Sequence, residues 1–306
     1  MSRSGGWLVT GGSGQLASAL AAYPESRMIG RPGFDFDRPE TIAPALAAAR
    51  PSLVVNAAAY TAVDAAETDA DAAFRANRDG PAALAAWCRD AGVPLIHLST
   101  DYVFDGSKGA PYVETDPTAP LGVYGASKLA GERAVLDSGA RAVILRTSWV
   151  YAPRGRNFML TMLGAGARMP RLRVVADQIG CPTTALDLAA AVAAVAERVA
   201  AGWREEYAGV THAAGSGFTS WHGFATAIFA EAAGFGGPAP EVAAIATADW
   251  PTPVRRPADS RLDCTRLAEL FGARLPDWRD GLRRTVAAWA AESRPSDLHR
   301  GAASLT

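Results

Sequence analysis

The feature that most constrains the fold is the alternation of short apolar runs with alanine-rich segments of helical periodicity. Four such pairs follow one another in the first 165 residues, and their apolar runs are "WLVT", "SLVVNAAA", "PLIHLST" and "RAVILRTSWVY". The runs are apolar throughout, which is typical of strands that are buried on both faces of a sheet. The pattern therefore predicts an α/β fold with a Rossmann-type, doubly wound parallel sheet.

The rest of the chain predicts a smaller lobe made of discontinuous pieces. Beyond about residue 165 the alternation loosens, and proline-rich joints, "DQIGCPTT" and "DWPTPVRRPADSRL", lie on either side of a strand-like "GVTHAAG" and a helix-like "SWHGFATAIFAEAAG". We expect a core domain over residues 1–165, rejoined by about 208–234, and a discontinuous C-terminal lobe over 166–306.

Composition excludes several classes of protein. The 306 residues carry 30 basic and 31 acidic side chains with scattered charges, so no nucleic acid and no membrane is an expected partner. Cys88, Cys181 and Cys264 are far apart and form no CxxC motif, which predicts neither a disulfide framework nor a metal site. No cleavable leader is recognisable, and no run reaches the ~18 apolar residues of a membrane helix. We expect a soluble cytoplasmic protein.

The first apolar run ends in a glycine-rich turn, "TGGSGQLA", which opens the first expected helix. Gly11, Gly14 and Ala17 have G-x-x-G-x-x-A spacing, in which backbone N–H groups can approach a pyrophosphate at the positive end of the helix. A plain strand-to-helix turn with glycines is the alternative. The position of the turn at the start of a βαβ pattern favours the dinucleotide site.

In a doubly wound sheet, ligands bind outside the carboxyl ends of the strands. This rule places residues 11–14, 57–61, 99–101 and 147–151 around one site.

The segment "SRMIGRPGFDFDRPE" bears on the choice of cofactor. It offers Arg31 where an acidic residue often binds the ribose hydroxyls, which favours a 2′-phosphate and hence NADPH, with NADH as the second candidate. Asp35 and Phe36 lie nearby and are candidates for the adenine end. A solvated loop cation explains Arg31 almost equally well, so both interpretations stay open.

Tyr124 and Lys128 are the candidates for acid–base chemistry. They lie four residues apart in "YGASK" at the start of an expected helix, so they share one face. A nearby ammonium favours the phenolate and lowers the tyrosine pKa from about 10 toward the working pH. An accidental pair on a solvated helix is the alternative. However, only two of the 30 basic residues are lysines, which indicates that a guanidinium does not serve here.

Further candidates follow the central strands. Thr100 closes "PLIHLST", where its hydroxyl can bind a substrate carbonyl that Tyr124 protonates, or can cap the following turn. Asp101 either contacts the substrate or caps the same turn. Trp149 in "RTSWVY" can stack on a sugar or a base. Arg256 in "PTPVRRP" suits a diphosphate clamp and, equally well, a solvated surface.

Several strings together resemble one family. They are "GGSGQLA", "VVNAAAYTAVDAAE", "HLSTDYVFDG", "PYVETDPTAPLGVYGASKLAGE", "LRTSWVY", "DQIGCPT" and "WPTPVRRPADSRL". Over about residues 6–290 the chain resembles the dTDP-4-dehydrorhamnose reductase family, a branch of the extended short-chain dehydrogenase/reductase superfamily. The strings over 56–67 and 99–106 are far longer than a generic YxxxK motif, so the resemblance is specific.

The resemblance implies an oxidoreductase that uses NAD(P)H to reduce the 4-keto group of dTDP-4-dehydro-6-deoxy-L-mannose, giving dTDP-L-rhamnose. It also implies an NAD(P)-binding Rossmann domain and a substrate-binding lobe. By matched motif, Tyr124 is the proton donor, Lys128 binds the nicotinamide ribose, and Thr100 orients the carbonyl. The expected substrate-binding residues are Thr100, Asp101, Trp149 and Arg256. The expected cofactor-binding residues are Gly11, Gly14, Gln15, Leu16, Arg31, Asp35, Phe36, Ala57, Ala59, Tyr60, Thr61, Leu98, Tyr124 and Lys128.

Two departures from the family pattern matter. Members that dimerise through magnesium use a glutamate in the first helix, where this chain has Ala19. We therefore expect no bound metal, and a monomer or a weak homodimer without the magnesium bridge. Arg31 stands where relatives can carry an acid, which tilts the cofactor toward NADPH. The alternative functions are a 4-ketoreductase or epimerase for another deoxysugar nucleotide, and a non-catalytic NADP-binding regulatory subunit.

Overall fold

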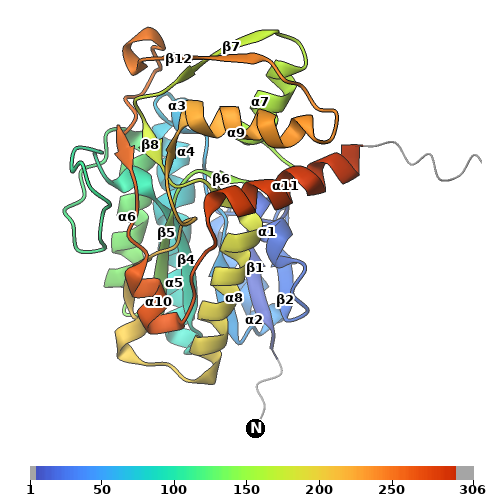
Figure 1. Cartoon of the computed structure of the whole chain (residues 1–306). Helices are drawn as coiled ribbons and strands as arrows, with labels where there is room; N and C mark the ends of the chain where they lie inside the picture. The colour runs from blue at the N-terminus through green and yellow to red at the C-terminus, as the bar shows by residue number, and fades with distance from the viewer. Residues whose placement is uncertain (1–4, 294–306) are drawn as a thin grey trace, which may run out of the picture.

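The computed structural model describes residues 5–293, and a six-stranded sheet lies at its centre (Figure 1). The strand order is β2-β1-β3-β4-β5-β10, and every neighbouring pair is parallel. The strands are β1 (Trp7–Thr10), β2 (Ser26–Ile29), β3 (Leu53–Asn56), β4 (Leu95–Thr100), β5 (Ala142–Thr147) and β10 (Gly209–His212). The predicted doubly wound parallel sheet is confirmed.

The sheet is buried on both faces, which explains its continuous apolar strands. Trp7 and Val9 belong to a core shared with helices α1, α8 and α10, whereas Leu8 belongs to a core on the other face, shared with α2, α5 and α6. Successive residues of a strand point to opposite faces, so one apolar run supplies both cores. The helices of this part are α1 (Gln15–Leu20), α2 (Ile42–Ala49), α3 (Val63–Ala66), α4 (Ala70–Phe74), α5 (Gly80–Ala91), α6 (Val123–Asp137), α8 (Ala185–Ala201) and α10 (Thr265–Phe271), with short turns η1 (Pro39–Thr41), η2 (Arg75–Asp79), η3 (Asp101–Val103) and η4 (Glu205–Tyr207).

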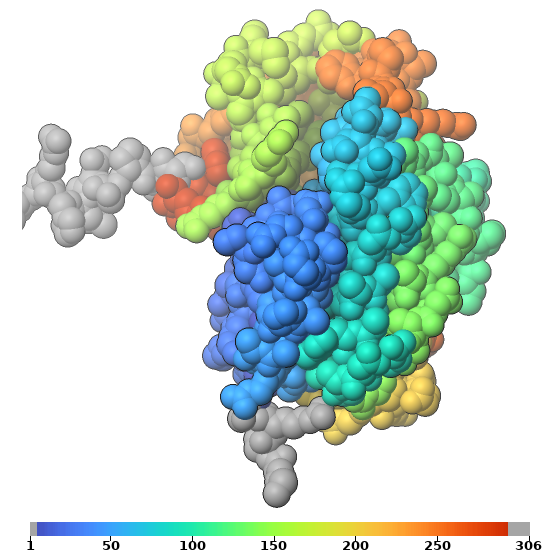
Figure 2. Space-filling model, turned by 180° about the vertical axis from the view of Figure 1, so that it is seen from behind, coloured from blue at the N-terminus to red at the C-terminus, as the bar shows by residue number. Residues whose placement is uncertain are grey.

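A second lobe lies beyond the carboxyl ends of these strands, at the top of Figure 1. Figure 2 shows the same lobe from behind, in yellow-green and orange above the blue and cyan core. Tyr151, Phe224 and Trp278 belong to its own apolar core. Its elements are β6 (Val150–Tyr151), α7 (Phe158–Gly166), β7 (Arg171–Val175), β8 (Ile179–Gly180), β9 (Thr183–Thr184), β11 (Thr219–Ser220), α9 (Trp221–Ala233), β12 (Glu241–Ile245), η5 (Thr247–Asp249), β13 (Asp259–Ser260) and α11 (Trp278–Ser293).

Individual elements divide between the lobes differently from the expected residue ranges. α8 and α10 fall within the residue range expected for the second lobe, but both belong to the apolar core on one face of the large sheet. α8 packs on α1 through its alanine and valine side chains. α9 falls within 208–234, yet it packs on α7, β7 and β12. β10 lies in the large sheet beside β5. The functional division of the chain into a cofactor part and a substrate part stays a prediction.

Two further observations concern membrane-spanning helices and the chemical state of the cysteines. No helix within residues 5–293 combines the length and apolar character required to cross a bilayer. The three cysteines are free thiols, and burial raises the pKa of each, to about 12 for Cys88, about 11 for Cys181 and about 12 for Cys264. These thiols are therefore poor nucleophiles at neutral pH.

Candidate active site

One large cavity opens at the carboxyl ends of the central strands. Its volume is ≈ 970 Å³, and its lining comes from the exits of β1, β2, β3, β4 and β5, from α6, and from parts of the second lobe. β2 and β3 lie on opposite sides of β1, so the sheet has its topological switch point here, where doubly wound folds bind ligands. The cavity is large enough for an extended ligand such as a dinucleotide.

Gly11 begins the turn that follows β1. Its φ is +100°, and a Cβ at this position would lie 2.9 Å from the carbonyl oxygen of Ala57 at the exit of β3. Any other residue would therefore be strained and would collide with the neighbouring strand exit. Gly11, Gly14 and Gln15 all line the cavity, and the two glycines present bare backbone to the ligand space, as a pyrophosphate-binding turn requires.

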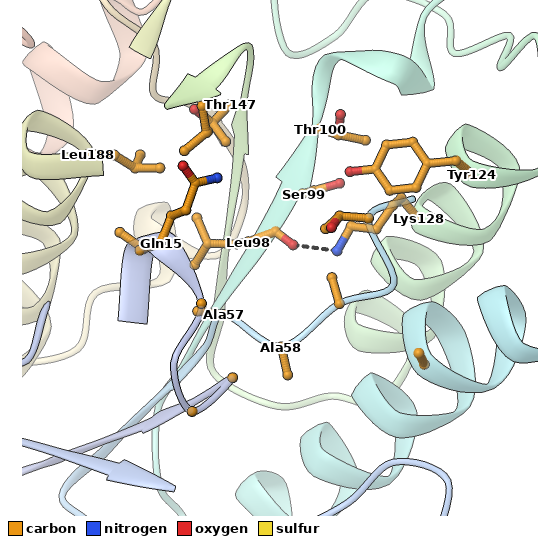
Figure 3. Close-up of a pocket in the computed structure, with 18 of the residues that line it drawn as sticks. Gln15, Ala57, Ala58, Leu98, Ser99, Thr100, Tyr124, Lys128, Thr147 and Leu188 are labelled. Carbon is orange, nitrogen blue, oxygen red and sulfur yellow. Dashed lines mark hydrogen bonds between the residues drawn. The ribbon is translucent and has the colours of Figure 1, made fainter. Parts of the chain in front are cut away.

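Lys128 lies on α6 and lines the cavity. It is 2% exposed, and its ammonium donates a hydrogen bond of 2.6 Å to the carbonyl oxygen of Leu98 on β4 (Figure 3). Burial lowers the pKa of Lys128 to about 8, and the charge of Glu132 opposes this change. Lys128 therefore carries its positive charge at neutral pH and loses it in mildly alkaline solution.

Tyr124 lies one helical turn before Lys128, and its hydroxyl points toward the exit of β4 (Figure 3). Gly125 permits this arrangement, because a Cβ there would lie 2.2 Å from the carbonyl oxygen of Tyr102. Burial raises the pKa of Tyr124 above its ordinary value, and the Thr100 hydroxyl opposes the rise. The expectation of a lowered tyrosine pKa is therefore wrong for this structure, since desolvation is the dominant influence. Tyr124 is a neutral acid with a proton to give.

Thr100 and Asp101 are buried, hydrogen-bonded polar residues beside Tyr124. The Thr100 hydroxyl donates to Asp101 Oδ1 at 3.0 Å and accepts from the backbone N–H of Tyr102 at 3.2 Å. The turn-cap role left open by the sequence is therefore present, and the same side chain also lines the cavity. Burial raises the pKa of Asp101 to about 6, while hydrogen bonding, including that from Thr100, opposes the rise.

Arg31 follows β2 and lines the cavity. Its Nε lies 3.0 Å from Asp35 Oδ1 and its Nη2 lies 2.9 Å from Asp37 Oδ2, while 71% of its side chain is exposed. Ion pairs this exposed are weak, so a phosphate can compete with the two carboxylates for the guanidinium. Phe36, by contrast, is mostly buried and packs on Phe34 at a ring-centroid distance of 5.3 Å.

An aromatic pair and an arginine complete the far side of the cavity. Trp149 has a φ of +47°, and its ring stacks on that of Trp221 with centroids 3.4 Å apart and planes inclined by 5°. The stack stabilises a strained backbone and leaves a flat apolar surface. Arg256 lines the same cavity and donates to both oxygens of Asp64 at 2.9 and 3.1 Å.

Of the residues expected to bind cofactor or substrate, only Tyr60 is absent from the cavity lining, which includes Ala59 and Thr61 on either side of it. The backbone of Tyr60 is instead held by Asn77, whose Oδ1 accepts from the Tyr60 N–H at 2.8 Å and whose Nδ2 donates to the Tyr60 carbonyl at 3.0 Å. The binding roles of all these residues stay predictions.

Sequence reasoning also missed part of the lining. Ser99 and Ser148 fall within the expected strand exits, but no role was assigned to them. Arg156 and Trp221 lie outside those exits, and no motif distinguishes either of them. Other lining residues without an earlier assignment include Gly12, Ser13, Val63, Ala76, Tyr102, Thr147 and Leu188.

The cavity suits a nicotinamide dinucleotide. Gly11, Gly12 and Gly14 line it after β1 without adding a side chain, and the Thr147 hydroxyl in the lining is buried without a hydrogen-bond partner in the described chain. Within residues 5–293, no group of three His, Cys, Asp or Glu side chains is placed to hold a metal ion. Fold and site together define an NAD(P)-dependent oxidoreductase of the extended short-chain dehydrogenase/reductase type.

Comparison with known proteins identifies the family. A family model described as the RmlD substrate binding domain matches residues 6–291. A dTDP-4-dehydrorhamnose reductase of Sinorhizobium fredii is 47% identical over 286 residues, covering 92% of this chain and 96% of that protein. The chain belongs to the dTDP-4-dehydrorhamnose reductase family.

Two further matches bear on cofactor and substrate. The crystal structure of a dTDP-4-dehydrorhamnose reductase from Bacillus anthracis in complex with NADP superimposes with a TM-score of 0.84 at 32% identity, covering 92% of this chain and 98% of that one. A protein of Streptomyces antibioticus, described as a probable dTDP-4,6-dihydroxy-2-methyloxan-3-one 4-ketoreductase, is 40% identical over 303 residues, 97% of this chain and 99% of that protein.

Proposed function

We propose that this chain reduces the 4-keto group of dTDP-4-dehydro-6-deoxy-L-mannose to a hydroxyl, giving dTDP-L-rhamnose. NADPH is the proposed cofactor, with NADH as the second candidate. The observation that carries the proposal is the placement of Tyr124, Lys128 and Thr100 around the exit of β4, inside one cavity. The family of the chain and the NADP complex of a relative support the same choice.

The chemistry follows from these three side chains. NADPH, when bound, supplies the hydride that adds to C4 of the sugar. When substrate binds, Thr100 would turn its one hydroxyl proton from Asp101 Oδ1 to the C4 oxygen and hold that oxygen beside Tyr124. Tyr124 gives its proton to that oxygen as negative charge develops there, which completes the alcohol. The ammonium of Lys128 then stabilises the phenolate that remains.

We further propose that the Rossmann part holds the cofactor and that the second lobe closes over the sugar nucleotide. The stacked ring of Trp149 offers a flat surface to a pyranose or a base. Arg256 has a forked guanidinium that suits a diphosphate. Asp101, which is buried beside Thr100, is placed to accept from a sugar hydroxyl.

A direct assay tests the function. Purified protein is mixed with dTDP-4-dehydrorhamnose and NADPH, the loss of NADPH absorbance is followed, and the product sugar is identified by NMR. We expect one dTDP-L-rhamnose for each NADPH oxidised. Binding of NADPH without oxidation by any dTDP-keto-sugar would contradict the proposal and favour a non-catalytic regulatory subunit.

A ketoreductase for another deoxysugar nucleotide is the second candidate, because the Streptomyces antibioticus relative matches nearly the whole chain. Its proposed chemistry at Tyr124 is the same, and only the sugar differs. Comparison of kcat/KM for the two keto-sugars distinguishes the candidates, since the native substrate should be preferred by at least about tenfold.

We also propose that the chain acts in the cytoplasm as a monomer or a weak homodimer without a magnesium bridge. α1 includes Ala19, and its first turn has no acidic residue. Sedimentation with magnesium and with a chelator should give the same mass. A dimer that dissociates in chelator would contradict the proposed state.

A further inference from the structure

The helix that carries Tyr124 and Lys128 also carries a third polar group, which lies outside the cavity lining. Glu132 lies four residues after Lys128, so it continues the same face of α6. Its side chain is almost completely buried, with 1% exposed. Burying a carboxylate costs free energy unless it is paired and hydrogen-bonded, so its partners decide what it does.

The partners of Glu132 come from two neighbouring strands. The Ser99 hydroxyl on β4 donates to Glu132 Oε1 at 2.5 Å. Arg146 on β5 forms a two-pronged ion pair, with Nε 2.9 Å from Oε1 and Nη2 2.6 Å from Oε2. Arg146 is 4% exposed, so the ion pair is also buried. One carboxylate therefore joins α6, β4 and β5 just below the cavity.

Each joined segment also carries residues of the proposed site. Ser99 stands between Leu98, whose carbonyl receives the Lys128 hydrogen bond, and Thr100. Arg146 directly precedes residues 147–150, which line the cavity. A shift of Glu132 would therefore displace the carbonyl that holds Lys128 and the hydroxyl proposed to orient the substrate.

A merely stabilising role does not explain this choice of residues. Buried ion pairs are often no more stabilising than apolar side chains of similar volume, because desolvation offsets the attraction of the charges. What such a pair supplies is directional contact, since two-pronged arginine–carboxylate bonds fix both partners in one orientation.

We propose that Glu132 is a positioning residue that, through Ser99 and Arg146, holds Lys128 and Thr100 in the geometry required for proton transfer from Tyr124. This inference rests on the proposed reductase function. It assigns Glu132 no contact with substrate or cofactor.

Ser99→Ala is the primary test, because it removes one bond to Glu132 and leaves the ion pair with Arg146 in place. Thr285→Val is the control, since it removes buried hydroxyl bonds of 2.8 Å to Thr184 and to the Gly281 carbonyl oxygen in the second lobe. We expect Ser99→Ala to lower kcat about tenfold while the NADPH Kd and the substrate KM change less than about twofold. The control should keep kcat, and both variants should have similar melting temperatures.

Glu132→Gln provides a second readout. It keeps the size of the side chain and an oxygen for Ser99 but leaves the Arg146 guanidinium without its counter-charge, so we expect a larger loss of kcat if the variant folds. If it does not fold, Ser99→Ala decides. A kcat for Ser99→Ala within twofold of wild type, or an equal loss of kcat in Thr285→Val, would overturn the inference.

A crystal structure of Ser99→Ala separates this inference from the proposed function. We expect the Leu98 carbonyl to move away from Lys128 Nζ, which can be observed whether or not the wild-type protein reduces the keto-sugar. An unchanged bond between these two atoms would reject the positioning role. An inactive wild-type protein would instead count against the function alone.

Discussion

The ammonium of Lys128 and the carbonyl oxygen of Leu98 are joined by a hydrogen bond of 2.6 Å, and both residues line the same cavity. Lys128 is buried, so a larger, planar guanidinium cannot replace its ammonium without displacing β4 or Tyr124.

We predict that Lys128→Arg lowers kcat about 100-fold. Lys108→Arg is the control, because Lys108, the other lysine, pairs with Asp116 in a loop outside the cavity lining. Equal activity of the two variants in a steady-state assay would refute the prediction.

Asp101 should make stability depend on pH. Burial raises its pKa to about 6 in the folded protein, above its value of about 4 in an unfolded chain. The folded state therefore binds this proton more tightly, and the contribution of Asp101 to the free energy of unfolding falls as pH rises from about 4 through about 6. We predict that Asp101→Asn is more stable than wild type at pH ~8, by about 2 to 3 kcal/mol, and that the difference shrinks near pH ~4.

Urea denaturation at the two pH values measures this difference directly. The expected gain in stability should accompany a loss of turnover, as is common where a site holds a strained or poorly solvated group. Equal stability of Asp101→Asn and wild type at both pH values would show that the buried carboxyl has an ordinary pKa.

Arg31 should select the phosphorylated cofactor. The Arg31 guanidinium can leave its exposed contacts with Asp35 and Asp37 and form charge-assisted hydrogen bonds with the 2′-phosphate of NADPH. We therefore predict that Arg31→Ala raises the Kd for NADPH about 10- to 100-fold. The Kd for NADH should change less than about twofold. Arg38→Ala is the control, because Arg38 pairs with Glu40 in the adjoining turn and does not line the cavity. Fluorescence titration gives the six dissociation constants of wild type and the two variants, and an unchanged ratio of the NADPH and NADH constants in Arg31→Ala would contradict the assignment.

Arg156 lies in a loop that is tied to the glycine turn. The neighbouring Asn157 donates from Nδ2 to Gln15 Oε1 at 2.8 Å, and Arg156 and Gln15 both line the cavity. A cation in this place suits the pyrophosphate, which NADPH and NADH share. We predict that Arg156→Gln raises both Kd values by a similar factor of about ten. Arg154→Gln, which removes a surface pair with Glu292, should leave both unchanged, and a selective loss of NADPH alone would instead place Arg156 at the 2′-phosphate.

Much of the site was predictable because its residues obey local rules. Tyr124 and Lys128 share a face through their spacing of four. Thr100 ends β4 and Trp149 follows β5, and the apolar runs of both strands are visible in the sequence. In a parallel sheet, strand exits meet at one edge, so local patterns alone bring these residues together.

The remaining features depend on contacts between distant segments. Arg256 meets Asp64 across 192 positions, and Trp221 stacks on Trp149 from a different element. The rise in the Tyr124 pKa results from burial against a strand exit, which spacing within one helix cannot reveal. The packing of α8 on α1 was missed for the same reason, because an alanine-rich helix fits either lobe equally well.

The central claim is that Tyr124 donates the proton in the reduction, and the most direct test is the turnover of Tyr124→Phe with dTDP-4-dehydrorhamnose and NADPH. The variant loses the hydroxyl and keeps the ring, so we predict a fall in kcat of at least about 100-fold with the NADPH Kd within about twofold of wild type. Tyr112→Phe, which removes a hydroxyl bonded to Asp105 outside the cavity lining, should retain kcat. Near-normal turnover of Tyr124→Phe would contradict the mechanism.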